Sequence, residues 1–381
     1  MTEIELVAPT LFGIEAITTR EIKRLGYTDT FVEDGRVTFK GDEAAICRAN
    51  LWLRTAERVL VKVGEFKATT FDELFEGTKA LPWDEWIPVE AAFPVKGHSL
   101  KSKLFSVPDC QAIVKKAVVE KLKKKYKKNW FEEKGPLYRI QFSLMKDRVT
   151  LMIDTSGEGL HKRGYRALSN EAPLRETLAS AMVQLSGWTY DRPLLDPFCG
   201  SGTIPIEAAL IGANIAPGIE REFTAEKWPN IPKKLWWDVR KEAHESAVKD
   251  VKLQIYGSDI DEKAVKLSRD NARKAGVDQY ITFEKKDVRN IIPRGDYGCI
   301  VCNPPYGERL GELKEVEKLY RDMGHIFKKL DTWSYYILTS HEGFERVFGR
   351  KADKNRKLYN GMIKCYYYQY FGPRPKGNGN T

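Results

Sequence analysis

The chain has 381 residues, which is too long for one ordinary domain and predicts two or three. Apolar residues make up 42% of the sequence, enough for substantial cores, and the formal net charge of +10 favours a polyanionic partner. The N-terminus, MTEIELVAPT, lacks the charged and apolar regions of a signal peptide. No apolar run approaches about 18 residues. We therefore expect a soluble, cytoplasmic protein without a membrane-spanning segment.

The six cysteines are scattered, so they predict no disulfide framework. Cys299 and Cys302 have the spacing of a metal or redox pair, but they lie in an apolar run and lack a second pair of ligands. Buried cysteines that act as small hydrophobic side chains are the favoured interpretation. The sequence predicts no metal site.

Residues 1–65 have the pattern of a small α/β module. Strands are expected at 4–8 and 58–66, helices at 11–25 and 44–53, and a hairpin at 31–39 around Glu33-Asp34-Gly35. The resulting order β-α-β-β-α-β resembles a ferredoxin-like unit.

Residues 66–160 form a second predicted module, with strands at 137–144 and 148–153 and a helix at 111–128. Apolar residues recur every four positions on this helix, and eight lysines occupy much of the rest. A solvated face would explain the lysines. However, Glu120 is the only acid among them, and residues 96–103, expected to be flexible, add more positive charge. We predict contacts with an RNA backbone from Lys101, Lys103, Lys116, Lys123, Lys124 and Lys127.

Residues 160–166, LHKRGYR, are interpreted as the junction between this module and the C-terminal part of the chain. A solvated linker is the alternative. The basic and aromatic side chains predict further RNA contacts from His161, Lys162, Arg163, Tyr165 and Arg166.

From about residue 167 the pattern changes to that of an open α/β sheet. Helices are expected at 173–187, 203–212, 262–275 and 313–330, and strands at 194–196, 253–257, 281–283, 297–302 and 333–338. Residues 213–250 are an insertion. Asn360-Gly361 predicts a final hairpin of 357–359 with 362–371, so an antiparallel pair ends an otherwise parallel sheet. Ligands of such sheets bind at the carboxyl ends of the strands.

The glycine loop Pro197–Thr203 (PFCGSGT) comes after the first of these strands. It does not match GxxxxGK[ST], and the third glycine of GxGxxG is replaced by Pro205, so neither a P-loop nor a dinucleotide site is indicated. The pattern suits a nucleoside without a pyrophosphate. Asp259 can accept from both ribose hydroxyls, and Asp287 can accept from an adenine amino group. A single aspartate here could equally be a helix N-cap, but acids after three consecutive strands favour a site.

Asn303-Pro304-Pro305-Tyr306 comes after the fourth strand. Two prolines cannot continue a central strand, and they fix the backbone rigidly where the sheet stops. The Asn303 side-chain oxygen and the Pro304 carbonyl can both accept hydrogen bonds from an exocyclic amine. Tyr306 can stack on the ring that carries this amine. An ordinary turn is the alternative for this motif taken alone.

Together, Asp196–Thr203, Gly257-Ser258-Asp259, Asp287, Asn303–Tyr306 and the terminal hairpin resemble a class I S-adenosylmethionine-dependent amino-methyltransferase. The segments His161–Arg166, Ala172–Glu176, Asn303–Arg309 and Arg356–Gly361 resemble, more closely, the THUMP-domain RNA guanine-N2 methyltransferases, in particular their bacterial 23S ribosomal RNA branch. The resemblance covers essentially the whole chain and is most specific after residue 160. It implies a ferredoxin-like domain at 1–65, a THUMP RNA-binding domain at 66–160, and a Rossmann-like methyltransferase domain with a seven-stranded sheet at 161–381.

The resemblance also implies site residues and a cofactor, S-adenosyl-L-methionine. The residues expected to bind it are Asp196, Pro197, Cys199, Gly200, Ser201, Gly202, Thr203, Asp259, Ile260, Asp287, Val288 and Asn303. Those expected to hold the target base and act in catalysis are Asn303, Pro304, Pro305 and Tyr306. Some relatives continue into a second methyltransferase domain, whereas this sequence stops at Thr381, so one methylation activity is expected.

The expected function is N2-methylation of a guanosine in RNA, with 23S ribosomal RNA as the favoured substrate. Transfer RNA, adenine N6 and DNA adenine remain as alternative substrates, because the NPPY motif alone does not separate guanine from adenine. An RNA chaperone that binds the cofactor without depending on Asn303 is an alternative of a different class.

Overall fold

The structure, a computed structural model, describes residues 3–166, 174–307 and 312–373. It forms two compact units, each of which is treated separately. Unit 1 comprises residues 1–10, 19–160 and 221–242, and unit 2 comprises residues 11–18, 161–220 and 243–381. Parts of two motifs quoted above, residues 172–173 and 308–309, lie outside the described residues.

The first part of unit 1 has the predicted ferredoxin-like order. It contains β1 (Ile4–Pro9), α1 (Glu15–Arg24), β2 (Thr30–Glu33), β3 (Arg36–Gly41), α2 (Glu43–Trp52) and β4 (Leu60–Lys67). The strands are antiparallel and lie in the order β2-β3-β1-β4. The predicted hairpin is confirmed, with Glu33 opposite Arg36 across its turn.

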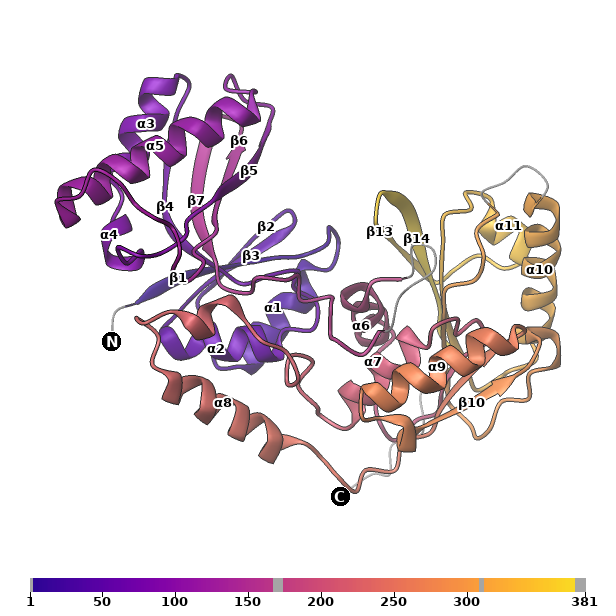
Figure 1. Cartoon of the computed structure of the whole chain (residues 1–381). Helices are drawn as coiled ribbons and strands as arrows, with labels where there is room; N and C mark the ends of the chain where they lie inside the picture. The colour runs from indigo at the N-terminus through magenta and orange to yellow at the C-terminus, as the bar shows by residue number, and fades with distance from the viewer. Residues whose placement is uncertain (1–2, 167–173, 308–311, 374–381) are drawn as a thin grey trace. The chain divides into compact units, whose positions relative to one another are not determined.

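The second part of unit 1 extends the same sheet. Its elements are α3 (Phe71–Ala80), α4 (Trp83–Trp86), β5 (Val95–Leu100), α5 (Val107–Tyr126), β6 (Ile140–Met145) and β7 (Arg148–Asp154). Strand β7 pairs with β4, so the two predicted modules share one seven-stranded sheet (Figure 1). The prediction of a flexible segment at 96–103 was wrong for its first half, because residues 95–100 pair with β6 as an edge strand. On α5, Val114, Val118 and Leu122 are buried as predicted.

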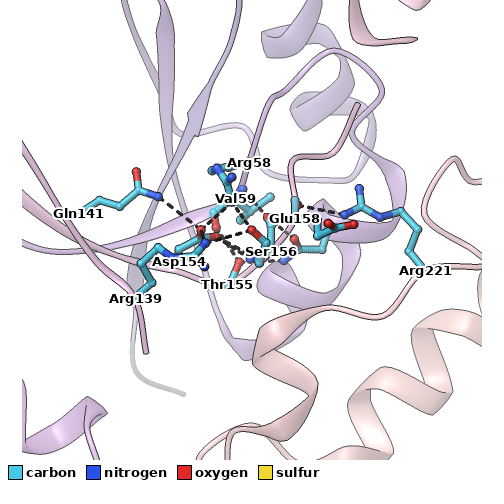
Figure 2. A network of polar contacts seen from close by, with 11 residues as sticks. Arg58, Val59, Arg139, Gln141, Asp154, Thr155, Ser156, Glu158 and Arg221 are labelled. Atoms are coloured by element: carbon cyan, nitrogen blue, oxygen red, sulfur yellow. Dashed lines mark hydrogen bonds and ion pairs between the residues drawn. The ribbon is translucent and has the colours of Figure 1, made fainter. Parts of the chain in front are cut away.

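Asp154, at the end of β7, is the centre of a polar network in unit 1 (Figure 2). Its carboxylate is fully buried and accepts hydrogen bonds from Arg58 at 2.6 Å and from Arg139 at 3.2 Å. Gln141 donates to the same oxygen, and the backbone N–H groups of residues 156 and 157 donate to the other. These donors compensate the cost of burying the charge and fix the chain where it leaves the sheet.

Part of the predicted insertion packs within unit 1. It contains the short helix η1 (Thr224–Lys227) and the part of α8 (Lys233–Ser246) up to Glu242. Trp228 stacks on Tyr138 with ring centroids 4.2 Å apart, and its indole N–H donates to the Leu137 carbonyl. Arg221 donates to the Glu158 carbonyl (Figure 2). The structure therefore differs from the predicted division, which placed all of residues 161–381 in one domain.

Unit 2 contains the second seven-stranded sheet, in the order β10-β9-β8-β11-β12-β14-β13. The strands are β8 (Leu194–Asp196), β9 (Ile255–Asp259), β10 (Ile281–Lys285), β11 (Cys299–Cys302), β12 (Ser334–Thr339), β13 (Lys354–Asn360) and β14 (Ile363–Tyr370). The first five are parallel, and β14 is antiparallel to both of its neighbours. The predicted Rossmann-like sheet with an antiparallel terminal hairpin is confirmed.

The helices of unit 2 are α6 (Glu176–Leu185), α7 (Thr203–Gly212), α9 (Glu262–Lys274), α10 (Glu312–Phe327) and α11 (Phe344–Phe348). Two short turns, η2 (Asp278–Tyr280) and η3 (Val288–Asn290), flank β10. All four residues of β11 are buried, which agrees with the interpretation of Cys299 and Cys302 as core side chains. In the described part of the chain, each helix is either too short or too polar to cross a membrane.

Candidate active site

The carboxyl ends of β8, β9, β10 and β11 meet at one edge of the unit 2 sheet, because these strands are parallel neighbours. A cavity of ≈ 820 Å³ lies at this edge. Its volume is within the range of about 300–1,000 Å³ that is usual for ligand sites. The cavity is lined by nine of the residues predicted from the sequence: Pro197, Asp259, Ile260, Asp287, Val288, Asn303, Pro304, Pro305 and Tyr306.

The glycine loop after β8 turns tightly into α7. Gly200 and Gly202 have φ angles of +51° and +82°, which residues with a side chain rarely adopt. A Cβ atom at Gly202 would lie 2.9 Å from the Cβ of Ser268, so this position also lacks room for a side chain. The Asn271 side chain donates to the Ser201 carbonyl at 2.9 Å and holds the loop from α9. Asn271 was not predicted, because nothing in its own segment marks it.

Three residues predicted to bind cofactor build this loop without lining the cavity. Cys199, Gly202 and Thr203 are buried. Burial raises the pKa of the Cys199 thiol well above its ordinary value, so this side chain stays neutral. The Thr203 hydroxyl accepts a hydrogen bond from Arg166 at 2.8 Å. Gly200 and Ser201 are half-buried and also lie outside the lining of the cavity.

Asp259, at the end of β9, faces the cavity and is fixed by two backbone donors. Its Oδ2 accepts from the Gly200 N–H and its Oδ1 from the Asp261 N–H, both at 3.0 Å. Each carboxylate oxygen keeps a second lone pair. The side chain can therefore accept two more hydrogen bonds, as a ribose diol requires.

Asp287 comes after β10 and serves as both an N-cap and a cavity residue. Its carboxylate accepts from the Arg289 N–H at 2.8 Å and pairs with the Arg289 guanidinium at 2.9 Å. Arg289 is held in turn by Asp322 at 2.7 Å. The N-cap alternative is thus correct for this residue, and it does not remove the carboxylate from the site, because Asp287 also lines the cavity.

The apolar part of the cavity fits a flat ring. Ile260 is 65% exposed although it lies at the end of a buried strand, and Val288 lines the same cavity. An exposed apolar side chain that lines the same cavity as two carboxylates is what a nucleoside site needs, because the base requires apolar contact and the ribose requires acceptors. The donors and acceptors present therefore fit the nucleoside part of S-adenosyl-L-methionine.

Asp196, at the end of β8, is buried and accepts a hydrogen bond from the Phe198 N–H at 3.0 Å. Burial raises the pKa of this carboxyl well above its ordinary value, and the nearby Asp259 adds to the effect. Asp196 does not line the cavity, although its neighbour Pro197 does.

We expect Asp196→Asn to stabilise the fold at neutral pH. An acid whose pKa is higher in the folded state loses stability as pH rises from its unfolded value of about 4 through the folded value. The amide keeps the acceptor for Phe198 and removes this titration. The unfolding temperature of the variant should exceed that of the wild type near pH 7, with a difference that shrinks as the pH approaches about 4. Thermal unfolding at a series of pH values measures this, and a pH-independent difference would contradict it.

The NPPY segment presents its acceptors to the cavity. The Tyr306 hydroxyl donates to the Asn303 side-chain oxygen, which keeps a second lone pair for a ligand. Burial raises the pKa of the Tyr306 phenol above its ordinary value, so the phenol remains a donor at neutral pH. Tyr306 was predicted to stack on the target base and to act in catalysis; the structure shows that it also orients the Asn303 amide.

Tyr320 of α10 supports this segment and was not among the predicted site residues. Its hydroxyl donates to the Pro305 carbonyl at 2.6 Å and shares a hydrogen bond of 2.9 Å with Thr339. Pro305 therefore has its carbonyl occupied, whereas no protein donor to the Pro304 carbonyl is present among the described residues. Only the tertiary fold brings α10 to this turn.

We expect Tyr320→Phe to lower kcat about ten-fold while leaving the KM for the methyl donor nearly unchanged. The change removes one hydrogen bond that positions the turn, worth about 1 kcal/mol, without touching the cofactor side of the cavity. Steady-state kinetics with varied donor concentration separates the two parameters. A rise in KM alone would show that Tyr320 acts on cofactor binding instead.

Other cavity residues come from elements that the sequence did not connect to the site. Glu315, Val316 and Leu319 belong to α10, and Asn360 and Ile363 lie at the turn of the β13–β14 hairpin. The Asn360-Gly361 signal located the hairpin but not its position beside the cavity. Among the described residues, no group of three or more His, Cys, Asp or Glu side chains could hold a metal ion.

Two of the predicted RNA contacts at the junction are corrected by the structure. Arg163 and Tyr165 are buried, and both donate to the carboxylate of Glu207 on α7 at 3.3 Å. Side chains held inside the core of unit 2 do not reach an RNA backbone. Arg166 is mostly buried and pairs with Glu176 at 3.4 Å, whereas Lys162 is exposed and His161 half-buried.

The lysines of α5 are less available than the sequence indicated. Lys115 pairs with Glu133, Lys123 pairs with Glu120, and Lys121 and Lys125 both lie within 4.0 Å of Asp84. Most of these acids are remote in sequence, so composition alone overestimated the charge of the helix. Lys116, Lys124 and Lys127 are exposed, as are Lys101 and Lys103.

The fold and the site define a class I methyltransferase, because the glycine loop, the strand-end acids and the NPPY turn all lie at one edge of the unit 2 sheet. Family sequence models agree. The model described as "RMKL-like, methyltransferase domain" matches residues 163–369. The models described as "THUMP domain" and "RlmL ferredoxin-like domain" match residues 68–154 and residues 5–60, respectively. The chain therefore belongs to the RlmL-like family of THUMP-containing methyltransferases.

Individual relatives support this assignment. The Bacillus subtilis protein "Putative RNA methyltransferase YpsC" is 55% identical over 373 residues, which cover 97% of each chain. A solved structure of "a predicted N6-adenine-specific DNA methylase" from Listeria monocytogenes has a TM-score of 0.93 at 54% identity, covering 98% of this chain and 97% of that one. The structure of SMU.472, "a putative methyltransferase complexed with SAH", has a TM-score of 0.93 at 46% identity, covering 99% and 100%. S-adenosyl-L-methionine is the methyl donor that agrees with this family and with the site.

Proposed function

We propose that this enzyme transfers a methyl group from S-adenosyl-L-methionine to the exocyclic N2 of a guanosine in 23S ribosomal RNA, in the cytoplasm. The observation that carries the proposal is the NPPY turn, which lines the same cavity as the strand-end acids and brings two carbonyl acceptors and an aromatic ring to it. Membership of an RNA methyltransferase family with a THUMP domain supports RNA as the substrate.

On the cofactor side, Asp259 would accept from the ribose hydroxyls and Asp287 from the adenine amino group. Ile260 and Val288 would contact the adenine ring, since all four residues line the same cavity. The backbone of the glycine loop can approach a ligand closely because Gly200 carries no side chain. When bound, S-adenosyl-L-methionine supplies an electrophilic methyl group on a sulfonium.

On the substrate side, the lone pair of a guanine N2 is delocalised into the ring and is a weak nucleophile. The Asn303 side-chain oxygen and the Pro304 carbonyl would accept hydrogen bonds from this amine. Both acceptors stabilise the positive charge that develops on nitrogen as the bond to carbon forms. No strong base is needed beforehand, because the proton can leave to solvent after the transfer. In-line positioning of the two bound groups should supply most of the acceleration.

Adenine N6 is the second candidate acceptor, since it is also an exocyclic amine and would make the same contacts with Asn303. The name of the Listeria protein specifies this chemistry on DNA, whereas the YpsC name specifies RNA. The THUMP module of this chain favours RNA. Guanine is favoured over adenine by the resemblance of the segments around Asn303 and Arg356 to the guanine-N2 enzymes.

The test is mass-mapping of ribosomal and transfer RNA from cells with and without the gene. The expected result is loss of one N2-methylguanosine from 23S ribosomal RNA. Loss of N6-methyladenosine instead would refute the base assignment, and loss from transfer RNA would refute the substrate. Unchanged RNA, together with complementation by an Asn303 variant, would favour an RNA chaperone that binds the cofactor without methylating.

A further inference from the structure

Glu315 of α10 lines the active-site cavity and has no part in the mechanism described above. Two cations share the lining with it, and both are held by other acids: Lys286 pairs with Glu284 at 3.5 Å, and Arg289 pairs with Asp287 at 2.9 Å. Within the described part of the chain, Glu315 has no ion-pair partner. Its side chain is exposed, so its acceptor lone pairs are open to a ligand in the cavity.

The first turns of α10 lie beside the NPPY turn. Val316, the next residue after Glu315, packs against Gly307, which follows Tyr306 in the chain: a Cβ atom at Gly307 would lie 3.3 Å from the Val316 Cβ. Tyr320, about one helical turn later, donates to the Pro305 carbonyl at 2.6 Å. Glu315 therefore lines the cavity from the part of the helix that contacts the proposed binding site of the target base.

The cofactor side of the cavity meets the same helix further along. Asp322 accepts from Arg289 at 2.7 Å, and Arg289 pairs with Asp287, the proposed acceptor for the adenine amino group of the cofactor. Glu315 and Asp322 are seven residues apart, so they lie on the same side of the helix and about 10 Å from each other. Glu315 is thus separated from the proposed adenine site and adjacent to the turn that would hold the target base.

A carboxylate at this position distinguishes guanine from adenine. In guanine, the ring nitrogen N1 beside the amine-bearing carbon carries a hydrogen, and a carboxylate can accept a hydrogen bond from it. In adenine, N1 beside the amine-bearing carbon has a lone pair instead, which would face the negative charge without a hydrogen bond. Asn303 and Pro304 offer acceptors that suit either exocyclic amine. A group that attracts one base and repels the other supplies the selectivity that these two acceptors lack.

We propose that Glu315 selects guanine by accepting a hydrogen bond from N1–H while Asn303 and Pro304 accept from N2. The inference rests on the proposed function, because it concerns the base held by the NPPY turn. A hydrogen bond to a charged group should contribute roughly 10- to 100-fold to the discrimination. The alternative is a solvated carboxylate on the helix surface, whose removal would leave the choice of base unchanged.

The test uses a ribosomal RNA fragment with either guanosine or 2-aminopurine riboside at the mapped target position. 2-Aminopurine keeps the 2-amine and lacks the hydrogen on N1, so this pair isolates the proposed contact. The variants of the full chain are Glu315→Gln and Glu315→Ala. Glu317→Gln is the matched control, because this acid lies on the same helix and does not line the cavity. Glu315 is exposed, so both of its variants should keep the fold, which thermal unfolding checks.

The readout is the ratio of single-turnover transfer to guanosine and to 2-aminopurine, compared between enzymes because the two amines differ in reactivity. Glu315→Gln should lower this ratio roughly 10-fold or more, since its amide can accept from N1–H in one base and donate to N1 in the other. Glu315→Ala should slow transfer to guanosine without slowing transfer to 2-aminopurine. Glu317→Gln should leave the ratio unchanged. An unchanged ratio in Glu315→Gln, or weaker binding of S-adenosylhomocysteine by this variant, would overturn the proposal.

Binding of mononucleotides separates this inference from the proposed function. Enzyme loaded with S-adenosylhomocysteine is titrated with guanosine, inosine and adenosine monophosphates by NMR, because the first two carry N1–H and the third does not. If the wild type methylates no guanosine but binds the first two more tightly through Glu315, the proposed function fails and the assignment of Glu315 stands. If the wild type methylates guanosine and Glu315→Gln changes neither the transfer ratio nor the nucleotide preference, the assignment fails and the proposed function stands.

Discussion

Replacing Asn303 by alanine should lower methyl transfer by about 10²–10³-fold, while the Kd for S-adenosylhomocysteine changes by no more than a few-fold. The reason lies in the geometry of the cavity, where Asn303 comes after β11 and the carboxylates of Asp259 and Asp287 lie at the ends of β9 and β10. Removing the amide deletes an acceptor that the amine needs most as its nitrogen becomes positive. The carboxylates proposed to bind the ribose and adenine are untouched.

Single-turnover transfer of labelled methyl groups to unmodified ribosomal RNA measures the chemical step, and calorimetry with S-adenosylhomocysteine measures binding. Asn303→Asp is the matched control, because it keeps an oxygen acceptor of the same size and should retain more activity than alanine. Tyr306→Phe removes the donor that orients the amide and should fall between the wild type and Asn303→Ala. Full activity of Asn303→Ala would remove the residue from catalysis.

The strand-end residues of the site could be predicted because each is fixed by local sequence. A short apolar run that ends in an acid, or in two prolines, marks the end of a buried strand, and parallel strands bring such ends together. The order of the strands was therefore enough to predict that Asp259, Asp287 and Asn303 lie at the same edge of the sheet. Tyr320 and Asn271 act through contacts with turns that are distant in sequence, so nothing in their own segments marks them.

The features of the fold that were not predicted from the sequence were missed for similar reasons. Strand β5, VKGHSL, lies at the edge of its sheet and alternates half-buried with exposed residues, so it lacks the apolar run that marks a central strand. The charge of α5 was overestimated because its carboxylate partners, Asp84 and Glu133, lie on other segments. Residues 221–242 were assigned with their sequence neighbours, although Trp228 packs on Tyr138 of unit 1.

Arg163→Met should destabilise unit 2 by about 3–5 kcal/mol, because it leaves the buried carboxylate of Glu207 without its guanidinium partner. In the sequence, Arg163 is one of several basic residues around a glycine, and loss of activity in this variant could be mistaken for loss of an RNA contact. The structure gives a different cause. Arg163 and Tyr165 hold α7 through Glu207, and α7 begins at the glycine loop of the site.

Lys162→Ala is the matched control, because this neighbour has the same charge and is exposed. It should change stability by less than about 0.5 kcal/mol. Hydrogen exchange of peptides from α6 and α7 reports the opening of unit 2, and peptides from β4 and β7 provide an internal reference in unit 1. Exchange in α6 and α7 should accelerate about 100-fold or more in Arg163→Met and stay unchanged in Lys162→Ala. Equal protection in both variants, with RNA binding lost only in Arg163→Met, would restore Arg163 as an RNA contact and refute its assignment to the core.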